Sequence, residues 1–122
     1  MPQHVLLIED EPNIVEAMRF LLSREGWGVS CHSDGASAVA RIRGDLPDLV
    51  ILDLMLPGRS GLEILAELRA DPTLAAVPVM MLTAKGQGRD RDAALRAGAT
   101  HFMTKPFSNA EMLAEVRAIM GR

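Results

Sequence analysis

The chain has 122 residues, a length that predicts one globular domain whose core needs no disulfide to support it. A formal net charge of −3 gives no reason to expect nucleic acid or an anionic membrane surface as a direct partner. Cys31 is the one cysteine, which excludes an internal disulfide and favours a reducing, cytoplasmic setting. The apolar run before Glu9 is too short for a signal peptide or a membrane span.

The first half of the chain predicts two strand–helix units. Val5–Ile8 is a continuous apolar run, typical of a strand that is buried on both faces of a parallel sheet. Pro12 suits the first turn of a helix, and apolar residues recur at helical spacing until Gly26, a residue typical of a left-handed helix cap. A weaker strand over residues 27–32 and a short helix that begins at Asp34 follow.

The second half of the chain repeats this pattern three times. Leu49–Leu52 and Val79–Leu82 are further apolar runs with the character of buried strands, and His101–Thr104 predicts a shorter fifth strand. A serine followed three positions later by a glutamate indicates a helix start at two places, Ser60 with Glu63 and Ser108 with Glu111. Five alternations of strand and helix predict an α/β fold, a single doubly wound parallel sheet with helices on both faces.

Polar residues follow four of the five predicted strands. Right-handed crossovers bring the carboxyl ends of parallel strands to one edge of a sheet, so these side chains should meet there. The residues concerned are Glu9, Asp10, Asp53, Thr83 and Lys105. Three neighbouring carboxylates repel one another unless a cation intervenes, and Mg²⁺ suits an all-oxygen site that is shared with a phosphate. Together with a lysine and a hydroxyl, they predict phosphoryl transfer to Asp53, which would form an acyl phosphate.

Four motifs in one order and spacing carry a family resemblance: Glu9–Asp10, Leu52–Gly58, Leu82–Ala84 and Lys105–Phe107. Together they resemble the receiver domain of two-component response regulators, over essentially the whole chain. The resemblance implies a flavodoxin-like sheet with strand order 2-1-3-4-5. It also implies that residues 1–122 form one receiver domain, with no output domain present in the chain.

The resemblance assigns a role to each matching residue. Asp53 would accept a phosphoryl group from a sensor histidine kinase or a phosphotransfer protein, and Lys105 would pair with the phosphoryl oxygens. Asp10, Asp53 and the backbone carbonyl of Met55 would hold Mg²⁺, and Glu9 would reach the ion through water. The chain would thus be a phosphorylation-activated switch rather than an enzyme with a separate substrate.

Further expectations concern the response to phosphorylation. Thr83 would move toward the phosphoryl group, and Phe102 would turn inward behind it. The Lys105–Pro106 peptide bond would be cis. Met55 and Lys85, each two residues past a site residue, would flank the path of the water that hydrolyses the acyl phosphate, so an apolar Met55 should slow this hydrolysis.

Each site residue also has a purely structural interpretation. Taken singly, Asp10 fits a helix cap, Asp53 a loop turn and Thr83 a partner for local backbone groups, while Phe102 fits a core aromatic. Two other functions fit the topology less well. An aspartate-dependent phosphatase of the haloacid dehalogenase type needs a second acid at position 55, where this chain has methionine. A flavin carrier needs a Ser/Thr/Gly-rich loop after the first strand, where this chain is acidic.

The motifs leave two kinds of response regulator open. The chain resembles receivers that precede winged-helix DNA-binding domains, so it is either a stand-alone regulator or the truncated receiver of such a protein. That subfamily usually carries an acidic pair before the switch aromatic, used for salt bridges across a dimer, but this chain has Thr100–His101 there. Arg91, Glu111 and Arg117 are left as partners for a homodimer through the last strand and its flanking helices.

Overall fold

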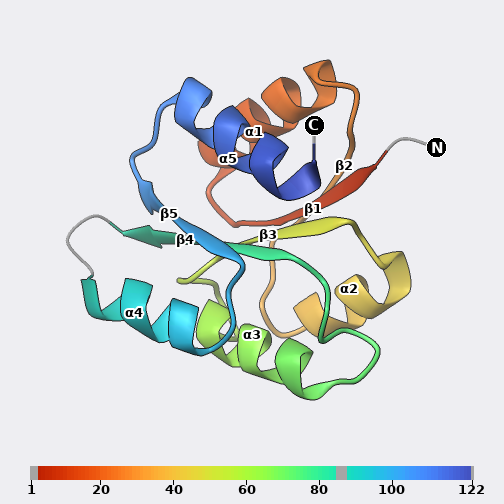
Figure 1. Ribbon diagram of the computed structural model, residues 1–122, viewed down its shortest axis with the longest axis vertical. Helices are drawn as coiled ribbons and strands as arrows, with labels where there is room; N and C mark the ends of the chain where they lie inside the picture. The colour runs from red at the N-terminus through yellow and green to blue at the C-terminus, as the bar shows by residue number, and fades with distance from the viewer. Residues whose placement is uncertain (1–2, 85–87, 122) are drawn as a thin grey trace.

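The computed structural model describes residues 3–84 and 88–121. Five strands and five helices alternate along them, as the sequence predicts (Figure 1). The strands are β1 (His4–Ile8), β2 (Gly28–His32), β3 (Leu49–Asp53), β4 (Val79–Ala84) and β5 (His101–Lys105). The helices are α1 (Pro12–Arg24), α2 (Ala38–Asp45), α3 (Gly61–Ala70), α4 (Gly88–Arg96) and α5 (Asn109–Met120). No helix in these ranges has the length and apolar character that crossing a bilayer requires.

All five strands are parallel and form one sheet in the order β2-β1-β3-β4-β5. This confirms the doubly wound parallel sheet that the alternating elements predict and the flavodoxin-like order that the family resemblance implies. Helices α1 and α5 cover one face of the sheet, and α2, α3 and α4 cover the other (Figure 1). The chain reverses direction across the sheet between β1 and β3, and in open α/β sheets ligands bind beyond the carboxyl ends of the strands at this point.

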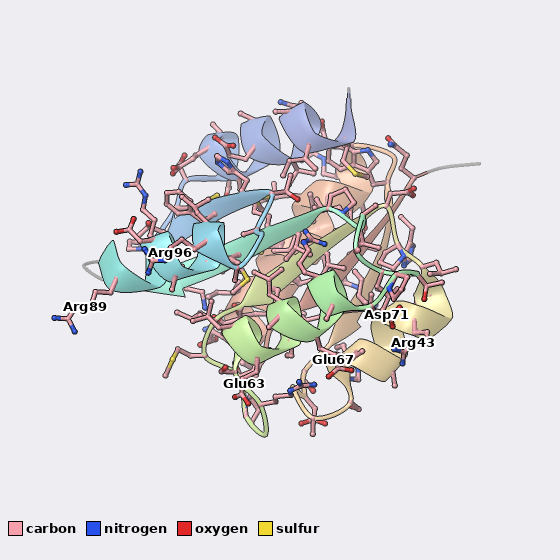
Figure 2. All side chains as sticks on the ribbon, turned by 60° about the horizontal axis from the view of Figure 1, so that its bottom comes forward. Arg43, Glu63, Glu67, Asp71, Arg89 and Arg96 are labelled. Carbon is pink, nitrogen blue, oxygen red and sulfur yellow. The ribbon has the colours of Figure 1, made fainter. Side chains whose placement is uncertain are left out.

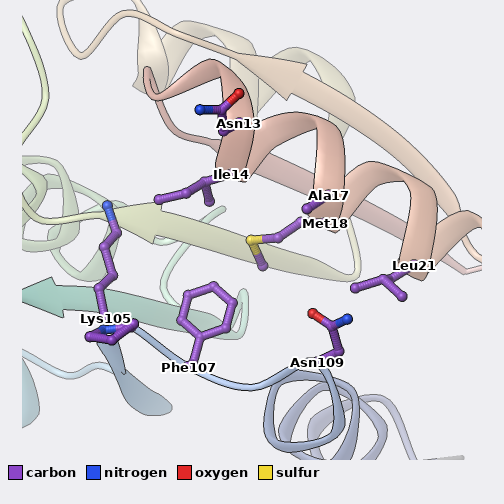
Figure 3. Close-up of a pocket in the computed structure, with 9 residues that line it drawn as sticks. Asn13, Ile14, Ala17, Met18, Leu21, Lys105, Phe107 and Asn109 are labelled. Atoms are coloured by element: carbon purple, nitrogen blue, oxygen red, sulfur yellow. The ribbon is translucent and has the colours of Figure 1, made fainter.

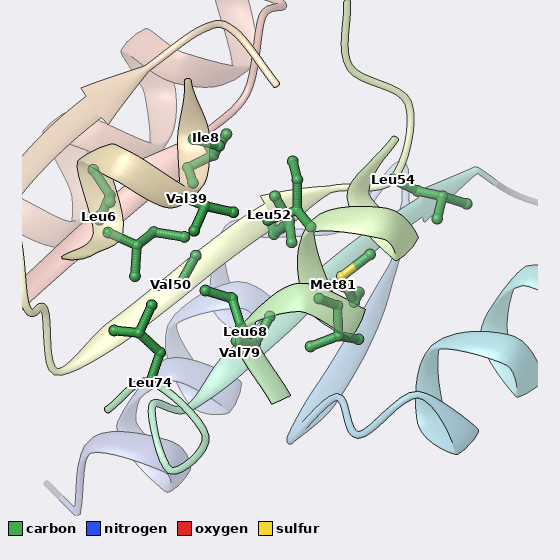
Figure 4. Close-up of a cluster of buried hydrophobic side chains, with 14 of the residues drawn as sticks. Leu6, Ile8, Val39, Val50, Leu52, Leu54, Leu68, Leu74, Val79 and Met81 are labelled. Atoms are coloured by element: carbon green, nitrogen blue, oxygen red, sulfur yellow. The ribbon is translucent and has the colours of Figure 1, made fainter. Parts of the chain in front are cut away.

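The central strand β3 is buried along its whole length. Val50 and Leu52 pack on the α2–α3–α4 side, where Figure 4 shows them beside Leu6, and Leu49 and Ile51 pack on the α1–α5 side. Each such side chain contributes about 1.5–3 kcal/mol by leaving water. Because helices cover both faces, the strand reads as an unbroken apolar run, and it provides a rigid support for the residue at its end.

The local sequence fixes one helix start as predicted and shifts another. Ser60 and Glu63 form the predicted capping box: Ser60 Oγ accepts from Glu63 N at 3.2 Å, and Ser60 N donates to Glu63 Oε1 at 3.3 Å. Helix α2 begins at Ala38 rather than at Asp34. The Asp34 carboxylate instead accepts hydrogen bonds from the backbone N–H and the hydroxyl of Ser37, which closes a turn ahead of the helix.

Candidate functional site

Three carboxylates meet at the carboxyl edge of the sheet. Asp53 is the last residue of β3, and Glu9 and Asp10 follow β1, the neighbouring strand. One carboxylate oxygen from each residue lies within 4.8 Å of the other two. Glu9 is 1% exposed and Asp53 is 5% exposed, whereas Asp10 lies at the surface. The strand order therefore produces the acidic cluster that the sequence predicts.

Lys105, the last residue of β5, brings a positive charge to this cluster. Its Nζ lies 2.8 Å from Glu9 Oε1 and 3.2 Å from Asp53 Oδ1. Burial opposes the charge of the lysine, but the hydrogen bond to Glu9 and the negative charge of Asp53 outweigh it, so the pKa of Lys105 is raised above its ordinary value. The ammonium group therefore stays charged where it faces the carboxylates.

The Glu9 carboxylate is held by the backbone as well as by Lys105. Its Oε2 accepts hydrogen bonds from Asp10 N at 3.1 Å and from Glu11 N at 3.0 Å. Burial raises the pKa of Glu9 above its ordinary value, although Lys105 and the Glu11 amide act in the opposite direction. Since both oxygens of Glu9 already face donors, this side chain suits contact with a metal through water better than direct ligation.

The Asp53 carboxylate is anchored through one oxygen. Its Oδ1 faces Lys105 Nζ and accepts a hydrogen bond from Met55 N at 3.3 Å. Both contacts within the described part of the chain use Oδ1, which leaves Oδ2 for a cation or an electrophile. The main chain of Met55 thus lies next to the acidic cluster, where its carbonyl is expected to act, while the residue as a whole is 72% exposed.

Thr83 and Phe102 lie on β4 and β5, next to the cluster. The Thr83 side chain is buried, and its Oγ1 donates to the carbonyl oxygen of Met103 on β5 at 3.5 Å. Phe102 is partly buried and packs against the hydrophobic cluster on the α2–α3–α4 side. The Lys105–Pro106 peptide bond is cis. Lys85, which the sequence associates with hydrolysis, lies outside the described residues.

A groove beside Lys105 was not anticipated from the sequence. It has a volume of about 430 Å³ and lies between α1 and the loop that leads into α5. Figure 3 shows Ile14, Met18 and Leu21 of α1 facing Phe107 across it. These α1 residues belong to the apolar residues that recur at helical spacing in the sequence, but this pattern predicts an apolar helix face and does not show that part of the face lines a groove.

Two of the three residues that the sequence offers for salt bridges across a dimer are engaged within the chain. Arg117 Nη2 lies 2.5 Å from Glu25 Oε1, the residue that follows α1. The Arg91 guanidinium lies over the ring of Phe102, 4.6 Å from its centroid. These contacts join α5 to α1 and α4 to β5, so a dimer that used either arginine would have to replace an internal contact.

The family model of the response regulator receiver domain matches residues 5–117. The chain belongs to this family. Receiver domains are signalling switches of two-component systems rather than conventional enzymes; they interact with histidine kinases and bind Mg²⁺ at an acidic site of the kind formed by Glu9, Asp10 and Asp53.

One curated relative is the probable transcriptional regulatory protein TcrX of Mycobacterium tuberculosis, which is 43% identical over 121 residues. The match covers 99% of this chain and 51% of TcrX, so the chain spans about half the length of that relative.

Two solved receiver domains have the same fold. One belongs to the sensor histidine kinase PA1611 of Pseudomonas aeruginosa and has a magnesium ion coordinated in its active site cleft; the TM-score is 0.89 at 30% identity, over the whole of both chains. The other is the BeF3-activated N-terminal receiver domain of RstA from Klebsiella pneumoniae. Its TM-score is 0.89 at 27% identity, covering 98% of this chain and all of the RstA domain.

Proposed function

We propose that Asp53 accepts a phosphoryl group from a phosphohistidine of a sensor histidine kinase or a phosphotransfer protein in the cytoplasm. The position of Asp53 carries this proposal. Its carboxylate is buried at the end of the central strand, within 4.8 Å of the oxygens of Glu9 and Asp10, and 3.2 Å from Lys105 Nζ. A nucleophile with acids on one side and a cation on the other suits phosphoryl transfer, where positioning and charge neutralisation provide most of the catalysis.

Each residue of the cluster has a separate role in this transfer. An Asp53 oxygen attacks phosphorus, the P–N bond of the donor breaks, a P–O bond forms, and the imidazole leaves with its electron pair and takes up a proton. Asp10, Asp53 and the Met55 carbonyl would hold Mg²⁺, with Glu9 acting through water. The bound ion supplies neutralisation of the charge on the phosphoryl oxygens. Lys105 pairs with these oxygens from the β5 side.

The signal then passes from the cluster to β4 and β5. Thr83 releases the carbonyl of Met103 and turns its hydroxyl toward the phosphoryl group, and Phe102 moves inward behind it. The surface of α4, β5 and α5 changes as a result and is the region through which a homodimer would form. The similarity to TcrX supports the receiver of a transcription regulator, in which this surface would control an attached output domain, over a stand-alone regulator.

The direct test is covalent modification of the whole chain. The protein is incubated with Mg²⁺ and acetyl phosphate or phosphoramidate and weighed intact by mass spectrometry. We expect one added phosphoryl group in the wild type, and none in Asp53→Ala or without the metal. Asp92→Ala, which removes an exposed acid on α4 that is not part of the cluster, is the matched control and should be modified normally. A phosphoryl group on Asp53→Ala would refute the assignment.

A further inference from the structure

Four side chains form a continuous row across the β5 edge of the sheet. The Arg91 guanidinium, from α4, lies 4.6 Å from the ring centroid of Phe102. The His101 ring stacks with the same ring, with centroids 5.7 Å apart and an angle of 24° between the planes. His101 Nε2 in turn lies 2.5 Å from Glu115 Oε2 on α5. This set, here called the Phe102 row, links α4 on one face of the sheet to α5 on the other.

The position of β5 in the sheet makes this row possible. Successive side chains of a strand point to opposite faces, so Phe102 packs on the α4 side while Met103 packs on the α5 side. His101 shares the side of Met103 and reaches Glu115 there. Since β5 is the last strand in the sheet order, no other strand of residues 3–84 and 88–121 covers its outer edge, and the rings of two consecutive residues meet there.

The contacts in the Phe102 row are weak enough for the Phe102 ring to change position. The His101 and Glu115 side chains are 39% and 34% exposed, so solvent weakens their attraction. A cation over an aromatic ring at an exposed site changes a population about two- to fivefold, and a stacked aromatic pair changes one about two- to thirteenfold. Contacts of this strength favour one position of the ring but leave the other position populated. A residue that switches between two positions requires this.

We infer that Arg91 and His101 are positioning residues that hold the Phe102 ring in its place on the α4 side before phosphorylation, with Glu115 fixing His101. The inference rests on the proposed function, because ring position has a consequence only if Phe102 takes part in the switch. Removing the contact of Arg91 or of His101 with Phe102 raises the population of the inward position of the ring. The conformation that accepts the phosphoryl group is then more populated before phosphorylation.

The ring can be observed directly by ¹⁹F NMR after labelling with 4-fluorophenylalanine. The chain has three phenylalanines, so Phe102→Leu assigns the signal. With Mg²⁺ and no phosphodonor, Arg91→Met should increase the population of the moved ring about threefold. The rate of modification by acetyl phosphate should rise by a similar factor. Arg91→Lys, which keeps a cation, should restore most of the wild-type signal.

Matched variants separate this role from a general effect on the fold. Arg89 lies on the same helix and extends into solvent (Figure 2), so Arg89→Met should leave the Phe102 signal unchanged. His101→Gln keeps a donor for Glu115 but loses the ring, and His101→Phe keeps the ring but loses the donor. Both should shift the population in the same direction as Arg91→Met.

The outcomes distinguish the two proposals. If wild-type protein gains a phosphoryl group on Asp53 but the Arg91→Met and His101→Gln signals match that of Arg89→Met, this inference is wrong and the proposed function stands. If the wild type gains no phosphoryl group on Asp53, the proposed function is wrong whatever the spectra show. A shift in the Arg91 and His101 variants, together with a phosphoryl group on Asp53 of the wild type and faster modification of Asp53 in these variants, supports both.

Discussion

Gly61, the first residue of α3, lies directly against the end of β3. A Cβ atom at this position would lie 2.4 Å from the carbonyl oxygen of Asp53 and 2.9 Å from Leu54 Cα. Gly61 N also donates to Leu54 O at 2.8 Å, which fixes the helix start to the strand end. Because these neighbours are backbone atoms, Gly61→Ala can be accommodated only if α3 or the end of β3 moves, and the Asp53 backbone moves with it.

The cost of this movement can be estimated. Overpacking a well-filled site costs about 1–3 kcal/mol, so about 2 kcal/mol is a reasonable central value. Unfolding entropy of about 2.1 cal/mol/K per residue gives roughly 0.26 kcal/mol/K for 122 residues. Gly61→Ala should therefore lower Tm by about 8 °C. Displacement of the Asp53 carboxylate by a fraction of an ångström should also slow its modification by acetyl phosphate, by up to about 100-fold.

Gly44→Ala makes the same chemical change within α2 and serves as the control. A Cβ at Gly44 meets nothing within 4 Å, and alanine is favoured over glycine in a helix by about 0.5–1 kcal/mol. Its Tm should rise by about 2–4 °C, with normal modification of Asp53. Both variants are compared by thermal unfolding, followed by circular dichroism, and by intact mass. A Tm of Gly61→Ala equal to or above that of the wild type would refute the steric reasoning.

Three further changes test the site and its support. Lys105→Met leaves the buried Glu9 carboxylate without its counter-charge and should lower the free energy of unfolding by about 2–3 kcal/mol at pH 7.5. Burial raises the pKa of Glu9 in the folded protein above its ordinary value of 4.5. A carboxyl group with a raised pKa makes the protein less stable as the pH rises from its ordinary pKa through its raised one. The destabilisation by Lys105→Met should therefore be smaller at pH 4.5 than at pH 7.5. Equal losses at the two pH values in urea unfolding would contradict this. Met55→Asn places a polar side chain at an exposed position beside Asp53 and should shorten the lifetime of the acyl phosphate severalfold. The lifetime is measured as decay of the phosphorylated mass. An unchanged decay rate would count against the expectation that an apolar Met55 slows hydrolysis. Arg69→Met removes hydrogen bonds to the carbonyls of Ala75, Val77 and Gly98 and should lower the free energy of unfolding by about 2–3 kcal/mol, measured by thermal unfolding. Arg69→Lys should lower it by less. Equal stability of the two variants would argue against a stabilising role of these hydrogen bonds.

The sequence by itself determined the order of elements and the residues of the acidic cluster. A strand covered by helices on both faces needs apolar side chains at every position, so Val5–Ile8 and Leu49–Leu52 stand out as unbroken runs. The handedness of the crossovers then places every carboxyl end at one edge. For this reason the polar residues at the run ends could be assigned to one site, although the sequence positions of Glu9, Asp53 and Lys105 span most of the chain.

Only the tertiary structure decided how the side chains pair at that edge and around it. The contact of Lys105 Nζ with Glu9 Oε1, the hydrogen bond from Thr83 to Met103 and the link between His101 and Glu115 join different strands and helices. Hydrophobic periodicity specifies which face of an element is buried, but it does not specify which side chain of the next element lies opposite. That choice depends on rotamers and on helix packing over the sheet, and these are fixed only when the whole core has formed.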